Sequence, residues 1–555
     1  MDISHTTVGG AASKAHIPEF ELKERSLETG NSRGNNEEEH DRVLKPKKTL
    51  SFHLSFLALN LMVLMVSLDA TALAVATPPI YASISEIFGR KGPLYSSILC
   101  FVLGSIIFAV AKDMLVLIVG RVFQGIGAGG LDVLGEIILV DMTTLKERPL
   151  YLGLFAIPMA GGVILGPIIG SLCTQFAGWR WLGWINLPIS ALNIALIFWF
   201  MRLTPIDGTL TSKIRRVNWF GMTLFGIGCT AFAAPLSWAG AMYPWKSWQT
   251  ILPMIFGFAV LVVFTLYENG TLGKPPTEPL FPARVFKSIT ATMSLVCSFF
   301  HGAIMYSGIF YMPLIFQAVF LESPLESAVS ILPLCCTSVG FGAIAGVFVQ
   351  VARKYRWAII VSWILTIVGC TLVVLGSQIP LGIGVGPFFS LLIIAIEASV
   401  ANVNDSGIAA GIFVCFRLFG GLVGLAICST VFSNVFEARI SSVDPLPTPL
   451  DILSDASKAV AFVPQLRALD FHPQILGGVL DAYQAAVVAV FLMLAGLAAL
   501  GLLASFAIKE ITIEIDQPGR QQLHKGAGDP DKMKEEERVG RDARCLGPRP
   551  SLICR

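Results

Sequence analysis

The sequence predicts an all-α protein that crosses a membrane many times, and three observations lead to this fold class. Of the 555 residues, 54% are hydrophobic and only 14% are charged, whereas soluble domains carry about 25% charged residues. The mean hydropathy is +0.70. Thirteen apolar runs have about the length that a transmembrane helix needs. This composition excludes an ordinary soluble enzyme, and the net charge of +2 gives no reason to expect a nucleic-acid partner.

Polar segments flank or interrupt the apolar runs. Residues 1–50 mix Glu, Gly, Asn and Ser and cannot bury a core, so we expect them to be disordered. Segment 434–483 is predicted to be a long loop, and 509–555 a polar tail. The thirteen predicted spans are 53–78, 95–111, 114–140, 151–172, 182–202, 219–239, 250–267, 289–318, 326–351, 357–377, 381–402, 407–433 and 484–508.

The cations in the short loops predict the orientation of the spans. Lys and Arg in short loops stay on the cytoplasmic side. When loop 81–94 is placed inside, the twelve later spans alternate and leave the basic C-terminal tail inside. The N-terminal tail ends in a lysine cluster at 45–48 beside the membrane and should be inside too, yet a single span at 53–78 would put it on the opposite side. Either a second helix has been lost between Pro78 and Tyr81, or the first run does not cross; the motifs below favour the loss.

The third apolar run places three ionisable groups on one helical face. At 100° per residue, Arg121, Asp132 and Glu136 fall on one stripe together with two small residues, Gly125 and Ala128. Such groups cost several kcal/mol against lipid. They are expected either to form a structural ion-pair network or to line a path for protons and substrate, and three groups on one face favour the path.

The fourth apolar run contains a ridge of glycines. Gly162, Gly166 and Gly170 recur every four residues, which allows another helix to approach closely. Pro167 removes one helical hydrogen bond and is expected to bend the helix.

Loop 81–94 has the pattern of a charge latch. Glu86 precedes a turn at Gly89, and two cations, Arg90 and Lys91, follow it. These charges are predicted to pair with helix ends in one conformation and to release them in another. The alternative interpretation is an ordinary positively charged cytoplasmic loop.

These motifs together resemble the major facilitator superfamily, in particular its fourteen-helix drug:proton antiporter branch as found in fungi. The resemblance covers roughly residues 50–508 in chain order, with Ala82 and Glu86 in place of the family's glycine and aspartate in the loop motif. The segments that carry it are Leu68–Thr71 with Pro78, Ala82–Lys91, Arg121–Gly130, Gly162–Gly170, Trp179–Pro188 and Phe416–Gly421. In the family a whole second helix precedes the loop motif, so the resemblance also implies that this helix is missing between residues 78 and 81.

The resemblance implies two six-helix halves and two extra linker helices, with about 13 spans present. The expected parts are a disordered cytoplasmic tail at 1–50, the N-terminal half at 51–202, the linker helices with a cytoplasmic loop at 203–288, the C-terminal half at 289–508 with its outer loop 434–483, and a cytoplasmic tail at 509–555.

The expected function is export of small amphipathic organic molecules in exchange for protons by alternating access. No phosphate-binding loop is present to use ATP, and no catalytic, cofactor or metal site is predicted. The intramembrane carboxylates are candidate proton acceptors, two arginines are their candidate partners, and His301 is interpreted as a packed core residue. The candidate path residues are Asp69, Arg121, Asp132, Glu136, Glu397 and Arg417.

The expected partners are the substrate, protons and the lipid bilayer. We expect a monomer in the plasma membrane, with the vacuolar membrane as the alternative and both termini cytoplasmic. Two other functions remain open: transport of siderophores or other nutrients by the same fold, and a chain that does not transport, either as a sensor or as an inactive product of splicing or of an incorrect gene model.

Overall fold

The computed structural model describes residues 50–68, 76–203, 209–239, 243–274, 276–400, 405–443, 447, 450–467 and 473–513. The chain divides into two units, 1–53 and 54–555, and the packing below is that of the second unit. Its described residues are almost entirely helical, with one isolated bridge between Ala239 and Tyr243 and no longer strand.

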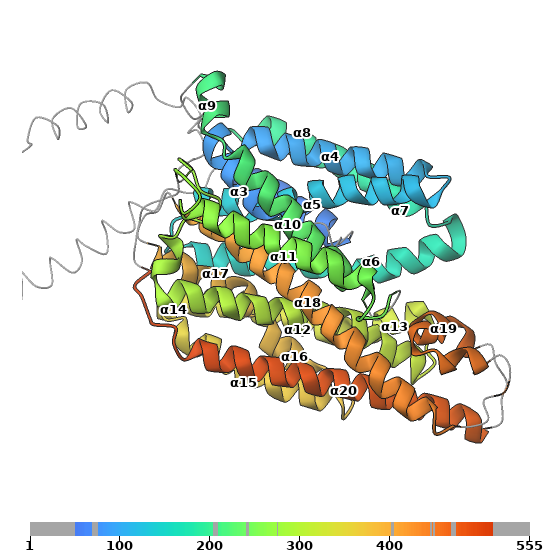
Figure 1. Cartoon of the computed structure of the whole chain (residues 1–555). Coiled ribbons are helices and arrows are strands. Elements are labelled where there is room, and N and C mark those ends of the chain that lie inside the picture. The colour runs from blue at the N-terminus through green and yellow to red at the C-terminus, as the bar shows by residue number, and fades with distance from the viewer. Residues whose placement is uncertain are drawn as a thin grey trace, which may run out of the picture. The chain divides into compact units, whose positions relative to one another are not determined.

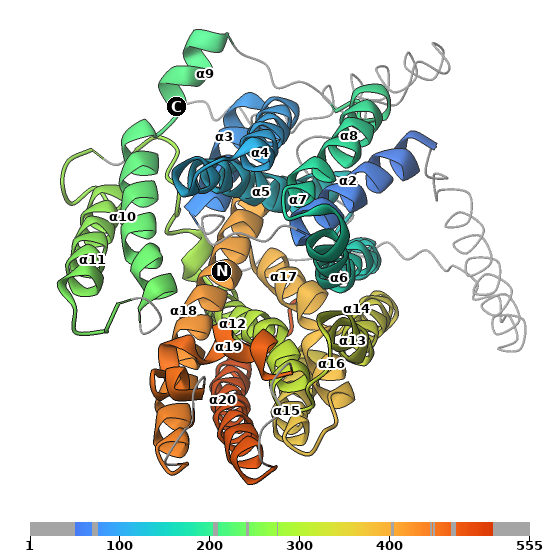
Figure 2. The same cartoon turned by 90° about the vertical axis from the view of Figure 1, so that its right-hand side faces the viewer.

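Two groups of helices make up most of this unit, and Figures 1 and 2 show them side by side. The N-terminal group consists of α3 (Thr77–Phe88), α4 (Lys91–Val110), α5 (Met114–Met142), α6 (Arg148–Leu172), the π-helical turn η2 (Cys173–Ala177), α7 (Trp181–Trp184) and α8 (Asn186–Phe200). The C-terminal group consists of α12 (Ile289–Ala318), α13 (Pro324–Ser330), α14 (Leu332–Ala352), α15 (Arg356–Val373), α16 (Ile379–Val385), α17 (Phe388–Ser399), α18 (Ser406–Ile440), α19 (Ala459–Leu466) and α20 (Pro473–Ser505).

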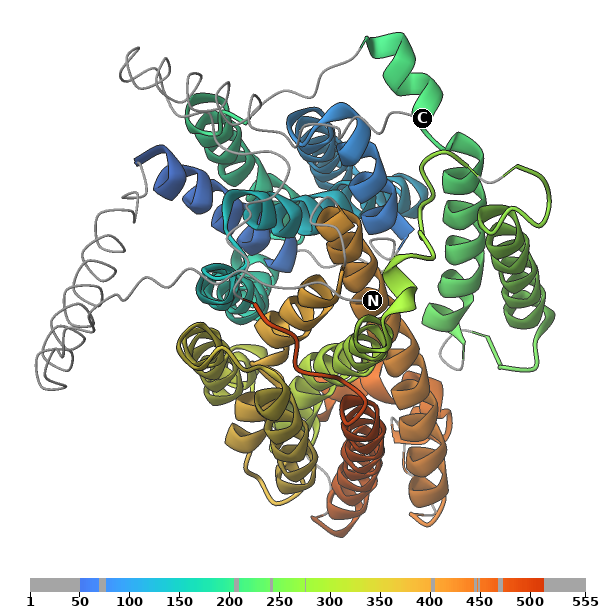
Figure 3. The same ribbon diagram turned by 90° about the vertical axis from the view of Figure 1, so that its left-hand side faces the viewer.

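Three further helices connect the two groups. The short α9 (Leu210–Arg216) precedes a pair, α10 (Trp219–Trp238) and α11 (Trp248–Glu268). This pair packs on α3 and α18 through an apolar cluster that includes Ile87, Phe225, Phe264 and Cys415. Figure 3 shows the pair at the periphery, beside α18.

The helix lengths confirm the predicted fold class. Among the described residues, eleven helices or joined helix pairs are long and apolar enough to cross a membrane. The 25 residues of α6 add another helix of about 38 Å at 1.5 Å per residue. Each of the twelve apolar runs that follow residue 94 in the sequence therefore contains a helix of membrane length.

The start of the chain differs from the predicted loop 81–94. Residues 77–88 form α3, whose first turn holds Pro78 and whose inner face buries Tyr81 and Ala82. The expectation of a loop from residue 81 was therefore wrong, because these side chains pack between α5 and α18. At 12 residues, α3 is about 18 Å long, well short of the roughly 30 Å hydrocarbon core. The preceding α2 (Leu50–Leu68) has 19 residues.

The expected outer loop 434–483 is also largely helical where it is described. The helix α18 continues to Ile440, and α20 already begins at Pro473. Between them lie two 3-10 turns, η5 (Leu450–Ser454) and η6 (Ala456–Lys458), and α19. Burial of Leu453, Phe462 and Leu466 explains why these residues are ordered as helix rather than as loop.

Glycines bring several helix pairs into backbone contact. A Cβ at Gly127 of α5 would lie 2.5 Å from the backbone nitrogen of Phe101 in α4, and a Cβ at Gly302 of α12 would overlap the carbonyl oxygen of Arg417 in α18. The prediction of close packing for the α5 glycines is thus confirmed. On α6 the close approach is at Gly153, which faces α14 at 3.2 Å, whereas a Cβ at Gly170 would meet nothing within 4 Å. The predicted contact ridge was wrong at that position.

Candidate functional site

A buried ion cluster joins the two helix groups near the middle of α5 and α18. The guanidinium of Arg417 lies 3.0 Å from Glu136 Oε1 and 3.3 Å from Asp132 Oδ2. The Arg417 side chain is 1% exposed, and it comes from a position 285 residues away from Asp132. Both carboxylates were predicted to share one face of α5, and the structure adds that a single cation from the other group serves both.

Aromatic rings and unpaired polar atoms surround this cluster. Arg417 Cζ lies 5.3 Å from the centre of the Phe413 ring and 5.6 Å from that of Phe389, distances typical of cation–π contacts. The ring of Phe389 also contacts His301 edge-on, with 4.9 Å between centroids. Both nitrogens of His301, Glu136 Oε2 and Arg417 Nε are buried without a hydrogen-bond partner. Such atoms retain the capacity to bind water, a proton or a polar group of a substrate.

The structure places Arg121 elsewhere than the candidate path implied. Its guanidinium lies over the Phe108 ring at 4.2 Å. Arg121 precedes Asp132 by three helical turns on α5, about 16 Å along the axis. Arg417, the other predicted partner, is the cation that pairs with the two carboxylates.

Two of the charges predicted to form a latch, Glu86 and Arg90, form a buried ion pair that Asp141 joins; we keep the name latch for these three residues. Arg90 donates to Glu86 Oε1 at 2.7 Å, to Ser85 Oγ at 2.7 Å and to Asp141 Oδ2 at 2.8 Å, and its side chain is 1% exposed. Gly89 makes the turn between α3 and α4 with φ of 90°, a region that favours glycine. Asp141, at the end of α5, was missed because nothing in its local sequence distinguishes it from a surface residue. Lys91 is the first residue of α4 and is half-buried.

This latch lies against the first turn of α18. A Cβ at Gly407 would come 2.5 Å from Glu86 Oε1 and 2.9 Å from Arg90 Nη2. The N-terminus of a helix carries partial positive charge, so the carboxylate of Glu86 is favourably placed there. The latch therefore ties α3 to α5 within the N-terminal group and packs against the first turn of α18.

A second buried ion pair connects the groups at the same helix ends. Arg148, at the start of α6, donates to Glu397 Oε2 of α17 at 2.6 Å, and the two side chains are 2% and 0% exposed. Arg148 also donates to the carbonyl oxygens of Val140 and Thr143 at the C-terminal end of α5. Glu397 was predicted as a proton acceptor, whereas Arg148 was treated only as a loop cation. Its partner is 249 residues away, so no local pattern could reveal the pair.

The remaining predicted residues are Asp69 and the glycine ridge of the fourth apolar run. Asp69 is outside the described residues. Gly162, Gly166, Pro167 and Gly170 all lie within the continuous helix α6. Within the part of the chain that the structure describes, no group of three or more His, Cys, Asp or Glu side chains could hold a metal ion.

The arrangement can close one end of the helix groups and hold charge at their centre. The latch, the Arg148–Glu397 pair and a hydrogen bond of 3.0 Å from Arg353 to the carbonyl oxygen of Lys146 all lie at the end formed by the C-terminus of α5 and the N-terminus of α6. We call this the ion-pair end. Opening it requires that the Arg148–Glu397 pair and the Arg353–Lys146 hydrogen bond break, whereas the charged members of the latch all belong to the N-terminal group and can stay paired.

Comparison with known proteins gives consistent matches along the chain. The sequence profile of the Major Facilitator Superfamily matches residues 43–425. The MFS-type transporter sphD of Aspergillus fumigatus is 42% identical over 530 residues, covering 88% of this chain and 90% of that protein. The MFS transporter L2 of a Phoma species is 33% identical, with 88% and 86% covered. The efflux pump FUS6 of Gibberella fujikuroi is 28% identical, with 89% and 96% covered.

Proposed function

The chain belongs to the Major Facilitator Superfamily, and on this premise we propose that it exports small amphipathic organic molecules in exchange for protons by alternating access. This family consists of integral membrane transporters of small molecules, not of enzymes. The direction of transport, the coupling to protons and the class of substrate are the proposed parts.

The buried cluster of Arg417, Asp132 and Glu136 is the observation that carries the proton coupling. Two carboxylates share one guanidinium, so the cluster has a net charge of −1 that one proton neutralises. A proton on either carboxylate weakens its attraction to Arg417, and this attraction joins α5 to α18. Binding and release of a proton are thereby linked to the contact between the two groups, which is what coupling alternating access to protons requires.

The names of relatives support export. The Gibberella protein is named an efflux pump, and another relative, 30% identical over 84% of this chain, is the acurin A biosynthesis cluster MFS-type transporter of Aspergillus aculeatus. The second name links that relative to a biosynthesis cluster, and we propose small amphipathic organic molecules as the substrates of this chain. We propose that the protein is a monomer in the plasma membrane. We also propose that the ion-pair end and both termini are cytoplasmic, because the loops at the ion-pair end are basic.

A second candidate is that this chain does not transport, and the length of α3 favours it. The alignment with the Aspergillus fumigatus transporter extends over 530 residues. It covers 88% of the 555 residues of this chain, which is about 488. About 40 residues of the relative therefore have no counterpart in this chain. About 40 residues can form one membrane helix and its loop. An N-terminal half with the 12-residue α3 in place of a full second helix would leave packing faces of its neighbours uncovered.

One comparison tests this second candidate. The test uses a variant of this chain, called the extended form. In this variant, the segment of the Aspergillus fumigatus transporter that this chain lacks is inserted between Pro78 and Pro79. If the second candidate holds, the extended form transports and this chain transports at less than a tenth of that rate, because the short α3 cannot complete the N-terminal half. Equal rates would refute the second candidate. Sequencing the native transcript across this junction shows independently whether a longer form is made.

Proton coupling is tested in the extended form with Glu136→Gln. In proteoliposomes with an acidic interior and the ion-pair end outside, we expect accumulation of an uncharged dye, and we expect the substitution to abolish the part that depends on the proton gradient. Glu278→Gln is the matched control, since Glu278 pairs with Arg216 at a solvent-exposed site. If Glu136→Gln keeps gradient-driven accumulation, the cluster does not couple transport to protons.

A further inference from the structure

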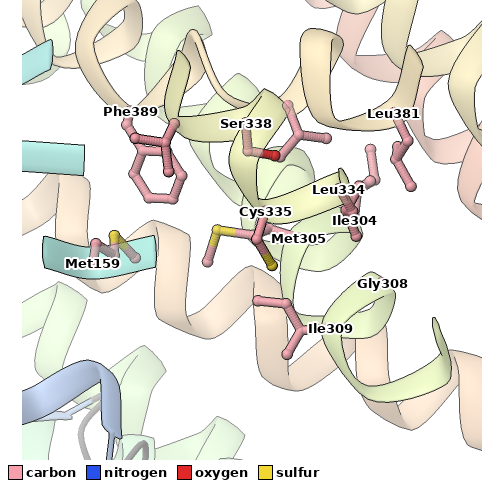
Figure 4. Close-up of a pocket in the computed structure, with 12 residues that line it drawn as sticks. Met159, Ile304, Met305, Gly308, Ile309, Leu334, Cys335, Ser338, Leu381 and Phe389 are labelled. Atoms are coloured by element: carbon pink, nitrogen blue, oxygen red, sulfur yellow. The ribbon is translucent and has the colours of Figure 1, made fainter. Parts of the chain in front are cut away.

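Two cavities beside the helices of the C-terminal group have a largely apolar lining, and they differ in position. The first is lined by α12, α14, α16 and α17 together with Met159 of α6, so it lies where the two groups meet (Figure 4). The second has about 700 Å³ of empty space, part of it open to the outside. Its lining comes from α12, α15 and α20 and from the residues that directly follow α12 and α15. We call it the three-helix cavity, and it lies within the C-terminal group.

The three-helix cavity lies beside the surface that faces lipid. The helices α15 and α20 contact each other, and Figures 2 and 3 show both at the edge of the C-terminal group. Each carries exposed apolar side chains, such as Val361 of α15 at 50% and Leu492 of α20 at 51%. In an integral membrane protein, side chains of this kind contact the lipid tails. The molecules that reach the cavity past these helices are therefore those of the bilayer.

Two glutamine amides supply the polar groups of the cavity. Gln484 belongs to α20, and Gln378 follows α15. The Gln378 amide donates from Nε2 to the carbonyl oxygen of Ser330, while its Oε1 is buried and has no hydrogen-bond partner among the described residues. An amide oxygen accepts a hydrogen bond from a hydroxyl, whereas a phosphocholine group has no hydrogen to donate. None of the residues that line the cavity carries a charge, so an uncharged hydroxyl is the complementary group.

These amides lie at the membrane surface opposite the ion-pair end. The helix α20 ends at Ser505 near the ion-pair end, where Arg356 at the start of α15 donates to the carbonyl oxygen of Phe506. Gln484 lies about 32 Å from Ser505 along the axis of α20, which is about the thickness of the hydrocarbon core. Phe491 also lines the cavity and lies about 10 Å deeper in the membrane than Gln484. The cavity thus runs from the polar surface of the bilayer into its apolar interior, as a membrane lipid does.

The apolar part of the lining is stiff. The rings of Phe316 and Phe320 lie 6.0 Å apart on its α12 side. β-branched side chains have few rotamers, and five of the lining residues are valines: Val319, Val373, Val374, Val487 and Val488. A flexible acyl chain loses conformational freedom when it is ordered in such a space, whereas fused rings have little to lose. A rigid lipid is therefore favoured over an acyl chain.

From these observations we infer that the three-helix cavity binds a membrane sterol. The sterol hydroxyl donates to Gln378 Oε1, and the fused rings extend along α20 toward Phe491. This site goes beyond the proposed function, because the sterol is a resident lipid rather than the transported molecule and binds without a proton gradient. A bound sterol contacts α12, α15 and α20 at once, so it should stabilise their packing on the side opposite the ion-pair end.

Photolabelling of this chain in phosphatidylcholine nanodiscs tests the site. The probe is a cholestanol that carries a diazirine in its rings and keeps the free hydroxyl. We expect mass spectrometry to find cross-links at Val319, Val488 or Phe491, and we expect excess unlabelled cholestanol to prevent them. Cholestanol methyl ether has the same rings but no hydrogen to donate. It should compete at least about fivefold less effectively, since the Gln378 oxygen then stays without a donor.

A cavity-filling variant and a matched control complete the test. Val488→Phe should fill the cavity and remove the cross-links, whereas Val361→Phe makes the same change at an exposed site of α15 and should leave them. Cross-links that persist in Val488→Phe, or that cholestanol does not prevent, would overturn the inference. If Val488→Phe does not fold, the unsubstituted chain decides the question: equal competition by cholestanol and its ether, or labelling confined to exposed residues such as Leu492, would reject the sterol site.

Discussion

Replacement of Arg417 by leucine is expected to lower the free energy of unfolding of this chain by about 3–5 kcal/mol. The substitution leaves two buried carboxylates, Asp132 and Glu136, without their shared cation, and uncompensated buried charge is the costliest result of breaking an ion pair. The measurement is equilibrium unfolding in mixed detergent micelles, followed by tryptophan fluorescence. In the extended form, the same substitution should abolish transport.

Two further variants identify the cause of the lost stability in Arg417→Leu. Arg439→Leu lies on the same helix but at an exposed position, and we expect it to change stability by no more than about 0.5 kcal/mol. Adding Glu136→Gln to Arg417→Leu removes one of the stranded charges and should recover part of the stability. If the double variant is as unstable as the sum of the two single changes, Arg417 does not act through these carboxylates.

Glu397→Gln is expected to loosen the ion-pair end. The substitution removes the charge that Arg148 faces at 2.6 Å while keeping the side-chain volume, so a buried guanidinium loses its counter-ion. Hydrogen–deuterium exchange should accelerate at least about tenfold at the backbone amides of Thr143 to Arg148, since each 1.4 kcal/mol lost from local stability gives a factor of ten.

An exposed ion pair provides the comparison for Glu397. Glu278 and Arg216 have side chains that are 27% and 43% exposed, and pairs of this kind contribute about 0–1 kcal/mol. Glu278→Gln should therefore leave exchange at Thr143 to Arg148 unchanged. If the amides of Thr143 to Arg148 exchange as slowly in Glu397→Gln as in the unsubstituted chain, the Arg148–Glu397 pair does not hold this end closed.

Features that depend on neighbouring residues could be predicted from the sequence. The twelve spans after residue 94 follow from runs of about 20 apolar residues, because a lipid interior requires helices of that length. The shared face of Asp132 and Glu136 follows from the helical period. The turn at Gly89 was predicted by the same local reasoning, and the structure has φ of 90° there.

Contacts between distant segments could not be predicted in this way. Arg417 and Asp132 are 285 residues apart, and Arg148 and Glu397 are 249 apart. Which arginine faces which carboxylate depends on how the two groups of helices pack, and hydropathy contains no information about that packing. Arg121 and Arg417 were both predicted as partners of the carboxylates; Arg417 pairs with them, whereas the Arg121 guanidinium lies over Phe108.

The charge of the central cluster has a consequence for the energy source of the proposed transport. With two carboxylates and one guanidinium, the cluster is negative when empty and neutral when it carries one proton. If the exported molecule is uncharged, each exchange moves one positive charge inward. Membrane voltage then drives export together with the pH difference, and 100 mV contributes about 2.3 kcal/mol per cycle. A voltage clamp across a planar bilayer should record this movement as an inward current.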